Sequence, residues 1–454
     1  MQREKFGSRL GFLLLSAGCA IGIGNVWRFP YVVGQNGGGL FVLLYVFFLA
    51  VVGIPVLTME FAIGRASRKS CIKAYQELEP KGSKWHWHGI FAMLGNYVLM
   101  AFYTTVAGWM LYYFYRFLTG EMSGLDKAGI DSAFSGMLTQ PVTMTVWMLI
   151  IVVLGFVICS FGLQKGVERI TKWMMVALLV IMVVLAVNSL FLPGASEGIR
   201  FYLVPDLSKV QETGILGTIT AAMNQSFFTL SLGIGAMLIF GSYLGRERRL
   251  LGESINIAIL DTFVAFVSGL IIFPACFAYD VPVDSGPPLI FMTLPNVFNS
   301  MEAGRVWGTL FFLFMSFASF STIVAVFENI LACTIDLSGW SRKKAALVNG
   351  IIVAIISMPC ILGYNVWSSF VPFEAGTAVL DLEDYLVSNI LLPGGSLVYL
   401  LFCVSRIGWG FKNYQEEANQ GVGPKVPNWV RGYVTFVLPI LVGVLLIQSI
   451  LRIK

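Results

Sequence analysis

The chain has 454 residues, of which 57% are hydrophobic and only 12% carry a charged side chain. Because an average soluble domain has about 25% charged residues, this composition excludes a soluble globular protein and predicts an integral membrane protein. The formal net charge of +5 is explained by basic residues beside the apolar stretches, so it calls for no nucleic-acid partner.

Apolar stretches of about 20 residues, the length that crosses about 30 Å of hydrocarbon, recur along the whole chain. They predict an all-α membrane protein with about eleven transmembrane helices and no soluble domain. The expected spans are approximately 10–34, 39–64, 88–118, 142–162, 171–193, 213–243, 255–279, 304–335, 345–363, 379–405 and 432–451.

Lys and Arg residues gather in alternate connections between these spans. Most of the 30 basic residues lie before residue 10 or within 65–84, 165–172, 246–249, 342–344 and 406–431. The positive-inside rule therefore predicts a cytoplasmic N-terminus, and eleven spans would place the C-terminus outside. No cleavage site made of small residues follows the first apolar run, so we expect no cleavable signal peptide.

Two of the predicted spans are interrupted by residues that break helices. The first contains GCAIGIGNVWRFP at 18–30, and the sixth contains NQSFFTLSLGIG at 224–235. Backbone groups freed by Gly and Pro inside a membrane need other partners, which either water in two flexible kinks or a bound solute could supply. An N–H group at the start of a resumed helix attracts an anion, and a free C=O group attracts a cation.

The two interruptions lie five spans apart and in spans of opposite direction. This arrangement predicts two inverted five-helix repeats with broken helices 1 and 6. We expect the first repeat at 1–193, the second at 194–411, and a final loop and span at 412–454.

Four motifs spread over the chain resemble those of the neurotransmitter:sodium symporter family, and in particular its bacterial transporters of hydrophobic or aromatic amino acids. The motifs are GNVWRFPY at 24–31, NGGG at 36–39, GIPVLTMEFAIGR at 53–65 and SFFTLSLGIGAM at 226–237. The resemblance covers essentially all of the predicted spans.

The resemblance implies two sodium sites built from hard oxygen donors. The first would use Ala20, Asn25, Thr229 and Asp261, together with the substrate carboxylate. The second would use the carbonyl groups of Gly18, Ile21 and Ala318 and the hydroxyl groups of Ser321 and Thr322. From the pattern alone, two adjacent hydroxyls in a span more often bond to their own helix.

The resemblance also implies the substrate site. The carboxylate would meet the amides of Ile23 and Gly24 and the hydroxyl of Tyr103, and the ammonium would meet Ala20, Phe228, Thr229 and Ser231. The side-chain pocket would be lined by Leu99, Tyr103, Phe228, Ile234, Ile323 and Val326. Monoamine carriers of the family have an aspartate where this chain has Gly22, so we expect a substrate that brings its own carboxylate.

Asp261 bears on ion dependence, since a carboxylate inside a span is costly and seldom lacks a purpose. Chloride-dependent relatives hold an anion near the positions of Tyr45, Gln225 and Thr229. Asp261 supplies a negative charge covalently, which predicts chloride-independent transport. Proton counter-transport by the emptied carrier is a further hypothesis.

The resemblance implies gates on both sides of the substrate. The outer gate would be the ion pair of Arg28 with Asp384, and Phe228 and Tyr103 would form an aromatic lid over the substrate. The inner gate would pair Arg3 with Asp336 and Phe6 with Ser242 and Tyr243. Glu60 would brace the broken helices through hydrogen bonds to their free amides. In one departure, Gly166 is followed by Val176 where relatives often have proline, which predicts a more stable inner end of the fifth span.

We therefore predict a sodium-coupled symporter of hydrophobic L-amino acids, with about two Na⁺ ions per cycle, in a bacterial plasma membrane. An amino-acid sensor or channel on the same fold, without coupled flux, remains the alternative. No arrangement of nucleophile, base or metal ligands in the sequence favours an enzyme.

Overall fold

The computed structural model describes residues 4–207, 214–279, 289–373 and 376–451, and helices dominate these ranges. In chain order the helices and π-helical segments (η) are α1 (Arg9–Ala20), η1 (Gly24–Arg28), α2 (Phe29–Gln35), α3 (Gly39–Phe48), η2 (Leu49–Gly53), α4 (Ile54–Ser67), α5 (Cys71–Leu78), α6 (His86–Thr119), α7 (Lys127–Leu138), α8 (Pro141–Ser160), η3 (Leu163–Glu168), α9 (Arg169–Leu190), α10 (Ala195–Leu203), α12 (Ile215–Thr229), α13 (Ala236–Tyr243), α14 (Leu250–Ala278), η4 (Leu289–Thr293), α15 (Leu294–Ser300), α16 (Gly304–Ser338), α17 (Arg342–Ile356), α18 (Met358–Leu362), α19 (Val379–Tyr385), η5 (Leu386–Leu391), α20 (Leu392–Val404), α21 (Phe411–Ala418), α22 (Val430–Gly432), η6 (Tyr433–Val437) and α23 (Leu438–Leu451).

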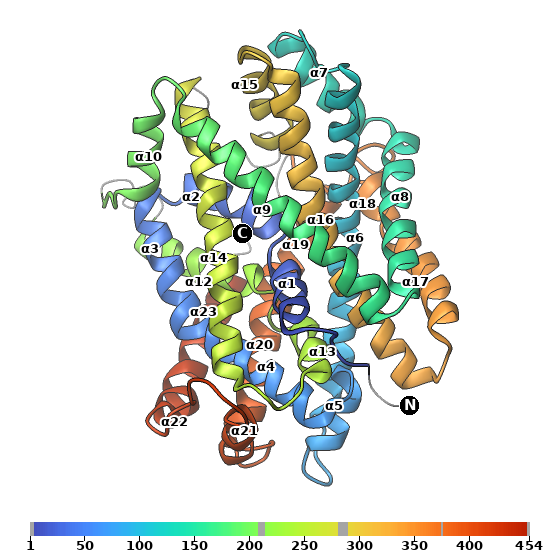
Figure 1. Ribbon diagram of the computed structural model, residues 1–454, viewed down its shortest axis with the longest axis vertical. Coiled ribbons are helices and arrows are strands. Elements are labelled where there is room, and N and C mark those ends of the chain that lie inside the picture. The colour runs from blue at the N-terminus through green and yellow to red at the C-terminus, as the bar shows by residue number, and fades with distance from the viewer. Residues whose placement is uncertain (1–3, 208–213, 280–288, 374–375, 452–454) are drawn as a thin grey trace.

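The all-helical membrane architecture is confirmed. In the described residues, nine helices are long and apolar enough to cross a membrane, and the bent pair formed by α1 with η1 and α2 makes a tenth candidate. The sixth predicted span is not among them because six residues, Leu230–Gly235, separate α12 from α13. In Figure 1, α6, α8, α14 and α16 run along the long axis of the molecule, and α1 lies near the middle of the view.

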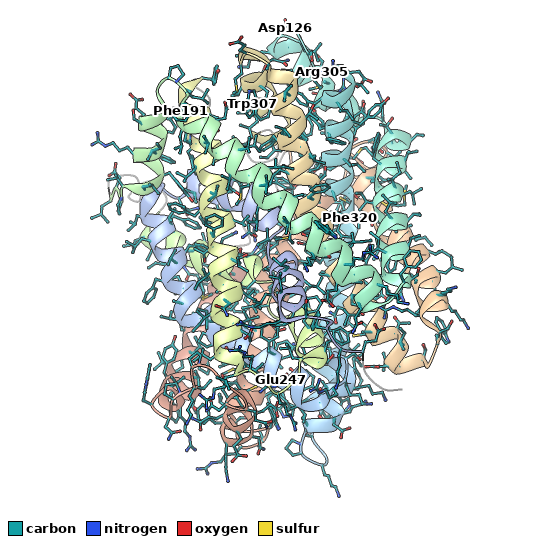
Figure 2. All side chains as sticks on the ribbon, viewed as in Figure 1. Asp126, Phe191, Glu247, Arg305, Trp307 and Phe320 are labelled. Atoms are coloured by element: carbon teal, nitrogen blue, oxygen red, sulfur yellow. The ribbon has the colours of Figure 1, made fainter. Side chains whose placement is uncertain are left out.

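The helices differ in how deeply they are buried. In its most apolar stretch, 78% of the residues of α16 are buried, against 28% for Val430–Leu451. Helices α16 and α6 therefore form the centre of the bundle, while the last span lies at its edge. Figure 2 shows Phe191 at the periphery, where a large apolar side chain suits a bilayer.

The fifth span begins earlier than predicted. Helical structure starts at Leu163 rather than near residue 171, because η3 leads directly into α9. Helix α9 is continuous through Val176, so the inner end of this span is helical in the structure. The longer polar connections also contain short helices, among them α7, α10 and α15.

The first break separates α1, which ends at Ala20, from the helix that resumes at Gly24, and the two parts meet at 52°. Two polar side chains of the second interrupted span donate hydrogen bonds to carbonyl groups at this break. The Ser231 hydroxyl donates to the carbonyl oxygen of Cys19 at 3.1 Å, and the Gln225 amide donates to that of Gly24 at 2.8 Å. The break is therefore held by the second interrupted span.

The second break depends on backbone geometry that glycine permits. Gly233 has a φ of +93°, and a Cβ atom at this residue would lie 2.2 Å from the carbonyl oxygen of Leu392. The Gly233 amide donates to the Glu60 carboxylate at 2.6 Å. Glu60 thus makes the kind of hydrogen bond expected of it, to a backbone amide that the break leaves free.

Candidate functional site

A cluster of neutral oxygen atoms lies between the first break and α16. The Ser321 hydroxyl oxygen is 3.0 Å from the Gly18 carbonyl oxygen, 2.9 Å from that of Ala318 and 3.4 Å from that of Ile21. The Thr322 hydroxyl oxygen lies 3.2 Å from the Gly18 oxygen and 3.5 Å from the Ile21 oxygen. We call these five residues the neutral cluster; they are the set expected for the second sodium site.

A second cluster lies between the first break and α14 and contains a carboxylate. The Asn25 amide donates to Asp261 Oδ1 at 2.7 Å, and the Thr229 hydroxyl lies 2.9 Å from Asp261 Oδ2. The Tyr45 hydroxyl donates to the same Oδ2 atom at 3.2 Å. We call these four residues the acidic cluster, and all four side chains are at most 1% exposed.

The donor atoms of both clusters suit a hard cation such as Na⁺. The neutral cluster gathers carbonyl and hydroxyl oxygens, the acidic cluster gathers hydroxyl and carboxylate oxygens, and oxygen is the donor that hard cations prefer. The Asn25 side chain turns its nitrogen towards Asp261, and its oxygen accepts from the Gly22 amide at 3.3 Å. Each cluster draws on the broken first span and on a helix distant in the sequence. Binding of an ion to either cluster can therefore affect the conformation of the helix break.

Between the two breaks lies a cavity of about 10 Å³, enough for one water molecule. Six residues that the sequence analysis assigned to the substrate line it: Ala20, Gly24, Leu99, Tyr103, Phe228 and Ser231. The Ile23 amide donates to the Tyr103 hydroxyl at 2.8 Å. These two groups were expected to bind the substrate carboxylate, and here they are partners of each other.

Three residues of the predicted side-chain pocket do not line this cavity. Ile234 lines a different cavity beside α20, and its carbonyl oxygen accepts a hydrogen bond from Asn96 at 2.8 Å. Ile323 and Val326 are fully buried in α16. The sequence motif located Ile234 at the break but could not show which side of the break its side chain faces.

A larger cavity of about 340 Å³ also borders Phe228 and is lined by Arg28, Asp381 and Asp384. The Arg28 guanidinium lies 4.4 Å from the centre of the Phe228 ring, and its Nη2 atom is 4.0 Å from Asp384 Oδ2. The structure thus brings the predicted outer pair together over the aromatic ring. In Figure 1, α7 and α15 lie at one end of the molecule, and α5 and α21 lie at the other.

At the opposite end, which we call the basic end and which carries α5 and α21, the predicted inner contacts are partly described. Phe6 and Tyr243 meet edge to face with their ring centres 5.8 Å apart. Asp336 accepts a hydrogen bond from the Ser70 amide at 2.7 Å. Arg3, its predicted partner, lies outside the described residues, and Ser242 is buried beside Tyr243.

Sequence reasoning missed a buried ion pair at the basic end. Glu328 in α16 is fully buried and pairs with Arg342, and its carboxylate also accepts from the Tyr243 hydroxyl at 2.7 Å. Arg342 in turn lies 3.3 Å from Glu4 Oε1 and donates to the Cys159 carbonyl oxygen at 2.8 Å. An acid inside an apolar span was the signal that could have found it.

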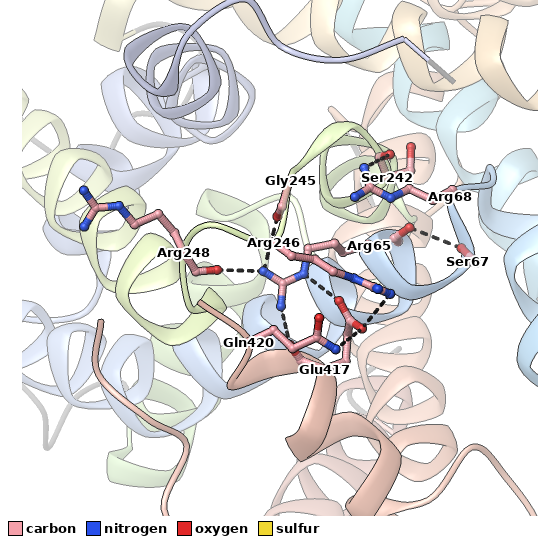
Figure 3. Close-up of polar contacts among 10 residues, drawn as sticks. Arg65, Ser67, Arg68, Ser242, Gly245, Arg246, Arg248, Glu417 and Gln420 are labelled. Atoms are coloured by element: carbon pink, nitrogen blue, oxygen red, sulfur yellow. Dashed lines mark hydrogen bonds and ion pairs between the residues drawn. The ribbon is translucent and has the colours of Figure 1, made fainter. Parts of the chain in front are cut away.

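Sequence reasoning also missed a set of polar contacts at the basic end, centred on the fully buried Arg65 (Figure 3). Its guanidinium lies 2.7 Å from Glu417 Oε1 and donates to the Arg248 carbonyl oxygen at 2.7 Å. Arg246 approaches the same carboxylate at 3.3 Å. These contacts tie the end of α4 to α21 and to the segment after α13.

Comparison with known proteins assigns the family. Residues 3–126 and 130–454 match the Sodium:neurotransmitter symporter family. The chain is 34% identical over 403 residues to the uncharacterized sodium-dependent transporter YhdH of Bacillus subtilis, covering 89% of this chain and 88% of that protein. It is 31% identical over 463 residues to an uncharacterized sodium-dependent transporter of Haemophilus influenzae, covering 99% and 98%.

A solved structure matches over the whole length. The crystal structure of MhsT in complex with L-phenylalanine has a TM-score of 0.89 and 34% identity, and the match covers 99% of this chain and 100% of that one. The fold, the two helix breaks and these matches agree. The chain is a multi-pass membrane protein that belongs to the Sodium:neurotransmitter symporter family, a family of sodium-dependent transporters and not of enzymes.

Proposed function

We propose that this protein imports hydrophobic L-amino acids together with two Na⁺ ions across a bacterial plasma membrane. The observation that carries the proposal is the convergence of the neutral cluster and the acidic cluster on one helix break, beside the Ile23 amide and Tyr103 hydroxyl. A substrate carboxylate bound at that amide lies next to the acidic cluster. The carboxylate can then complete the shell of one sodium ion, which couples the two solutes physically.

The absence of a side chain at residue 22 supports an amino acid rather than an amine. A Cβ atom at Gly22 would lie 2.1 Å from the Tyr103 hydroxyl and 2.3 Å from the Thr322 hydroxyl. A protein carboxylate cannot enter here without displacing both groups. The substrate must therefore bring its own carboxylate, which an amino acid does and a simple amine does not.

The lining of the site supports an apolar side chain. Leu99 and Phe228 border the small cavity, and its two hydroxyl groups nearest the break, on Tyr103 and Ser231, already have backbone partners. That MhsT was crystallised with L-phenylalanine, a hydrophobic amino acid, is in line with this assignment. The cavity of about 10 Å³ requires the lid over it to open before a substrate enters.

Alternating access would then rock the broken spans and their neighbours, spans 1, 2, 6 and 7, against the remaining helices. The outer cavity beside Arg28 would close and the contacts of the basic end around Glu328 and Arg65 would open. Each Na⁺ ion that enters contributes about 2.3 kcal/mol per 100 mV of membrane potential, in addition to its concentration gradient. That energy drives accumulation of the amino acid.

Uptake into proteoliposomes tests the proposal. Radiolabelled leucine, phenylalanine, tyrosine and tryptophan are supplied with an inward sodium gradient, with potassium in place of sodium, and with chloride replaced by gluconate. We expect sodium-driven accumulation that does not depend on chloride. As a negative control, we expect Gly22→Asp to abolish uptake because its side chain would displace the Tyr103 and Thr322 hydroxyl groups, and its melting temperature shows that the variant is folded.

Two outcomes would overturn the proposal. Sodium-dependent binding without accumulation would identify a sensor rather than a symporter. A requirement for external chloride would contradict the role that we assign to Asp261.

A further inference from the structure

A third cavity, of about 600 Å³, lies on the far side of the second break from the substrate site. Its walls are the start of α6, the break itself at Gly233 and Ile234, and the segment from Ile390 to Val398 in η5 and α20. Eight helical residues correspond to about 12 Å along the axis. The cavity is thus almost as deep as one leaflet of the hydrocarbon core, about 15 Å.

The walls are apolar over most of this depth. Phe91 and Ala92 line one side, and Leu391 and Val398 line the other. Phe91 is 60% exposed, and Leu94 one turn further along α6 is 54% exposed, so this face of α6 is turned towards lipid. His88 also lines the cavity, and its Nδ1 atom lies 2.9 Å from the Tyr75 hydroxyl. Among the residues that the structure describes, the lining includes no carboxylate, so the ammonium group of a zwitterionic amino acid would lack a charged partner here.

The mouth of the cavity, at the basic end, carries polar and cationic side chains. Lys84 and Trp85 line it, and the Trp85 indole donates to the carbonyl oxygen of Ile407 at 2.8 Å. This bond holds the segment with Arg406, whose side chain is exposed, beside the mouth. Across the described ranges of the chain, no ion pair involves Lys84 or Arg406.

We propose that this cavity binds one anionic phospholipid from the leaflet at the basic end. The headgroup lies at Lys84 beside the Trp85 indole, which is the usual place of tryptophan at a membrane surface. One acyl chain runs along α20 and ends against Gly233 and Ile234. The combination of a cationic mouth, apolar walls and a depth close to one leaflet matches this class of molecule.

The site has a consequence for the transport cycle. The acyl chain would contact the second break from behind, opposite to the face that meets the substrate. Gly395 packs so closely that a Cβ atom there would lie 2.0 Å from the Gly233 carbonyl oxygen. Filling or emptying the cavity therefore acts on the backbone of the break.

Native mass spectrometry of the purified full-length protein tests the site without any measurement of transport. The protein is titrated with phosphatidylglycerol and, separately, with phosphatidylcholine, and bound lipid is counted. We expect one phosphatidylglycerol molecule to bind more tightly than the others, and we expect Lys84→Gln to weaken this molecule about fivefold, the effect of one basic residue near a membrane surface.

The matched control is Lys81→Gln, because Lys81 is exposed in the same connection and does not line the cavity. Gly394→Leu tests the apolar part. The nearest atom to a Cβ at Gly394 is Leu446 Cδ2 at 3.8 Å, so a larger side chain enters without meeting backbone. We expect Gly394→Leu to displace the tightly bound lipid, and its melting temperature shows that the variant is folded.

Three outcomes would overturn the inference. If the wild type, Lys84→Gln and Gly394→Leu retained the same amount of bound phosphatidylglycerol, the cavity would hold no specific lipid. An equal loss in Lys81→Gln would show that only diffuse charge attracts the lipid. Equal binding of phosphatidylcholine would show that the mouth does not select an anionic headgroup.

Discussion

The neutral cluster and the acidic cluster sit on either side of one helix break, yet they differ in charge. The neutral cluster joins the break to α16 through hydroxyl and carbonyl oxygens, whereas the acidic cluster joins it to α14 through the carboxylate of Asp261. A broken span supplies free carbonyl groups to both. The partner helix therefore decides whether a site carries a formal charge, and a charged site depends on that single residue more than a neutral site depends on any one ligand.

The largest effect is expected from removing the charge of the acidic cluster. Asp261→Asn keeps the size of the side chain and loses its charge, and charge-assisted contacts are worth about 1.5 to 3 kcal/mol. We expect sodium-driven uptake in chloride-free medium to fall about 100-fold, as 2.7 kcal/mol implies. Uptake at different sodium concentrations measures this.

Chloride sharpens the same experiment. If the charge is what matters, added chloride restores part of the uptake of Asp261→Asn and leaves the wild type unchanged. If Asp261→Asn took up substrate at the wild-type rate in chloride-free medium, that result would contradict the distinction between the two clusters.

In the neutral cluster, Thr322→Val removes one hydroxyl and preserves the shape of the side chain. One neutral contact is worth about 1 kcal/mol, so we expect the apparent affinity for sodium to fall about fivefold. Ser319→Ala is the matched control, because its buried hydroxyl lies 3.1 Å from the Ser316 carbonyl oxygen and belongs to neither cluster. An equal effect of both variants would indicate a general loss of stability in α16.

Within the acidic cluster, Tyr45→Phe removes one hydroxyl group that donates a hydrogen bond to the Asp261 carboxylate. The Tyr45 hydroxyl is 3.2 Å from Asp261 Oδ2, longer than the 2.7 Å contact of Asn25 with Oδ1. We expect a smaller loss, about threefold in apparent sodium affinity, with no gain of chloride dependence. A loss as large as that of Asp261→Asn would mean that Tyr45 itself contributes to ion binding.

The smallest effect on sodium affinity is expected outside both clusters. Asp384 faces Arg28 at 4.0 Å with a third of its side chain exposed, and pairs of this kind are worth at most about 1 kcal/mol. Asp384→Asn should change the rate of uptake less than about fivefold and leave the sodium dependence unchanged. A shift in sodium affinity would show that the outer pair communicates with the clusters.

The sequence by itself determined the membrane class and the position of nearly every span, because apolar runs of span length and the distribution of basic residues are local properties of the chain. It also located both breaks through their glycines and polar side chains. The resemblance to the family named residues that the structure indeed gathers, such as Asn25 with Asp261 and Gly18 with Ser321.

Only the tertiary structure decided which face of a helix meets which neighbour. Ile234 turns towards α20 rather than the small cavity, and Glu328 finds its partners in Arg342 and Tyr243. A one-residue turn of a helix moves a side chain by about 100°, so the outcome depends on the packing of helices distant in the sequence. Local patterns therefore predict the spans and their breaks, whereas the cavities beside them arise only when the helices pack together.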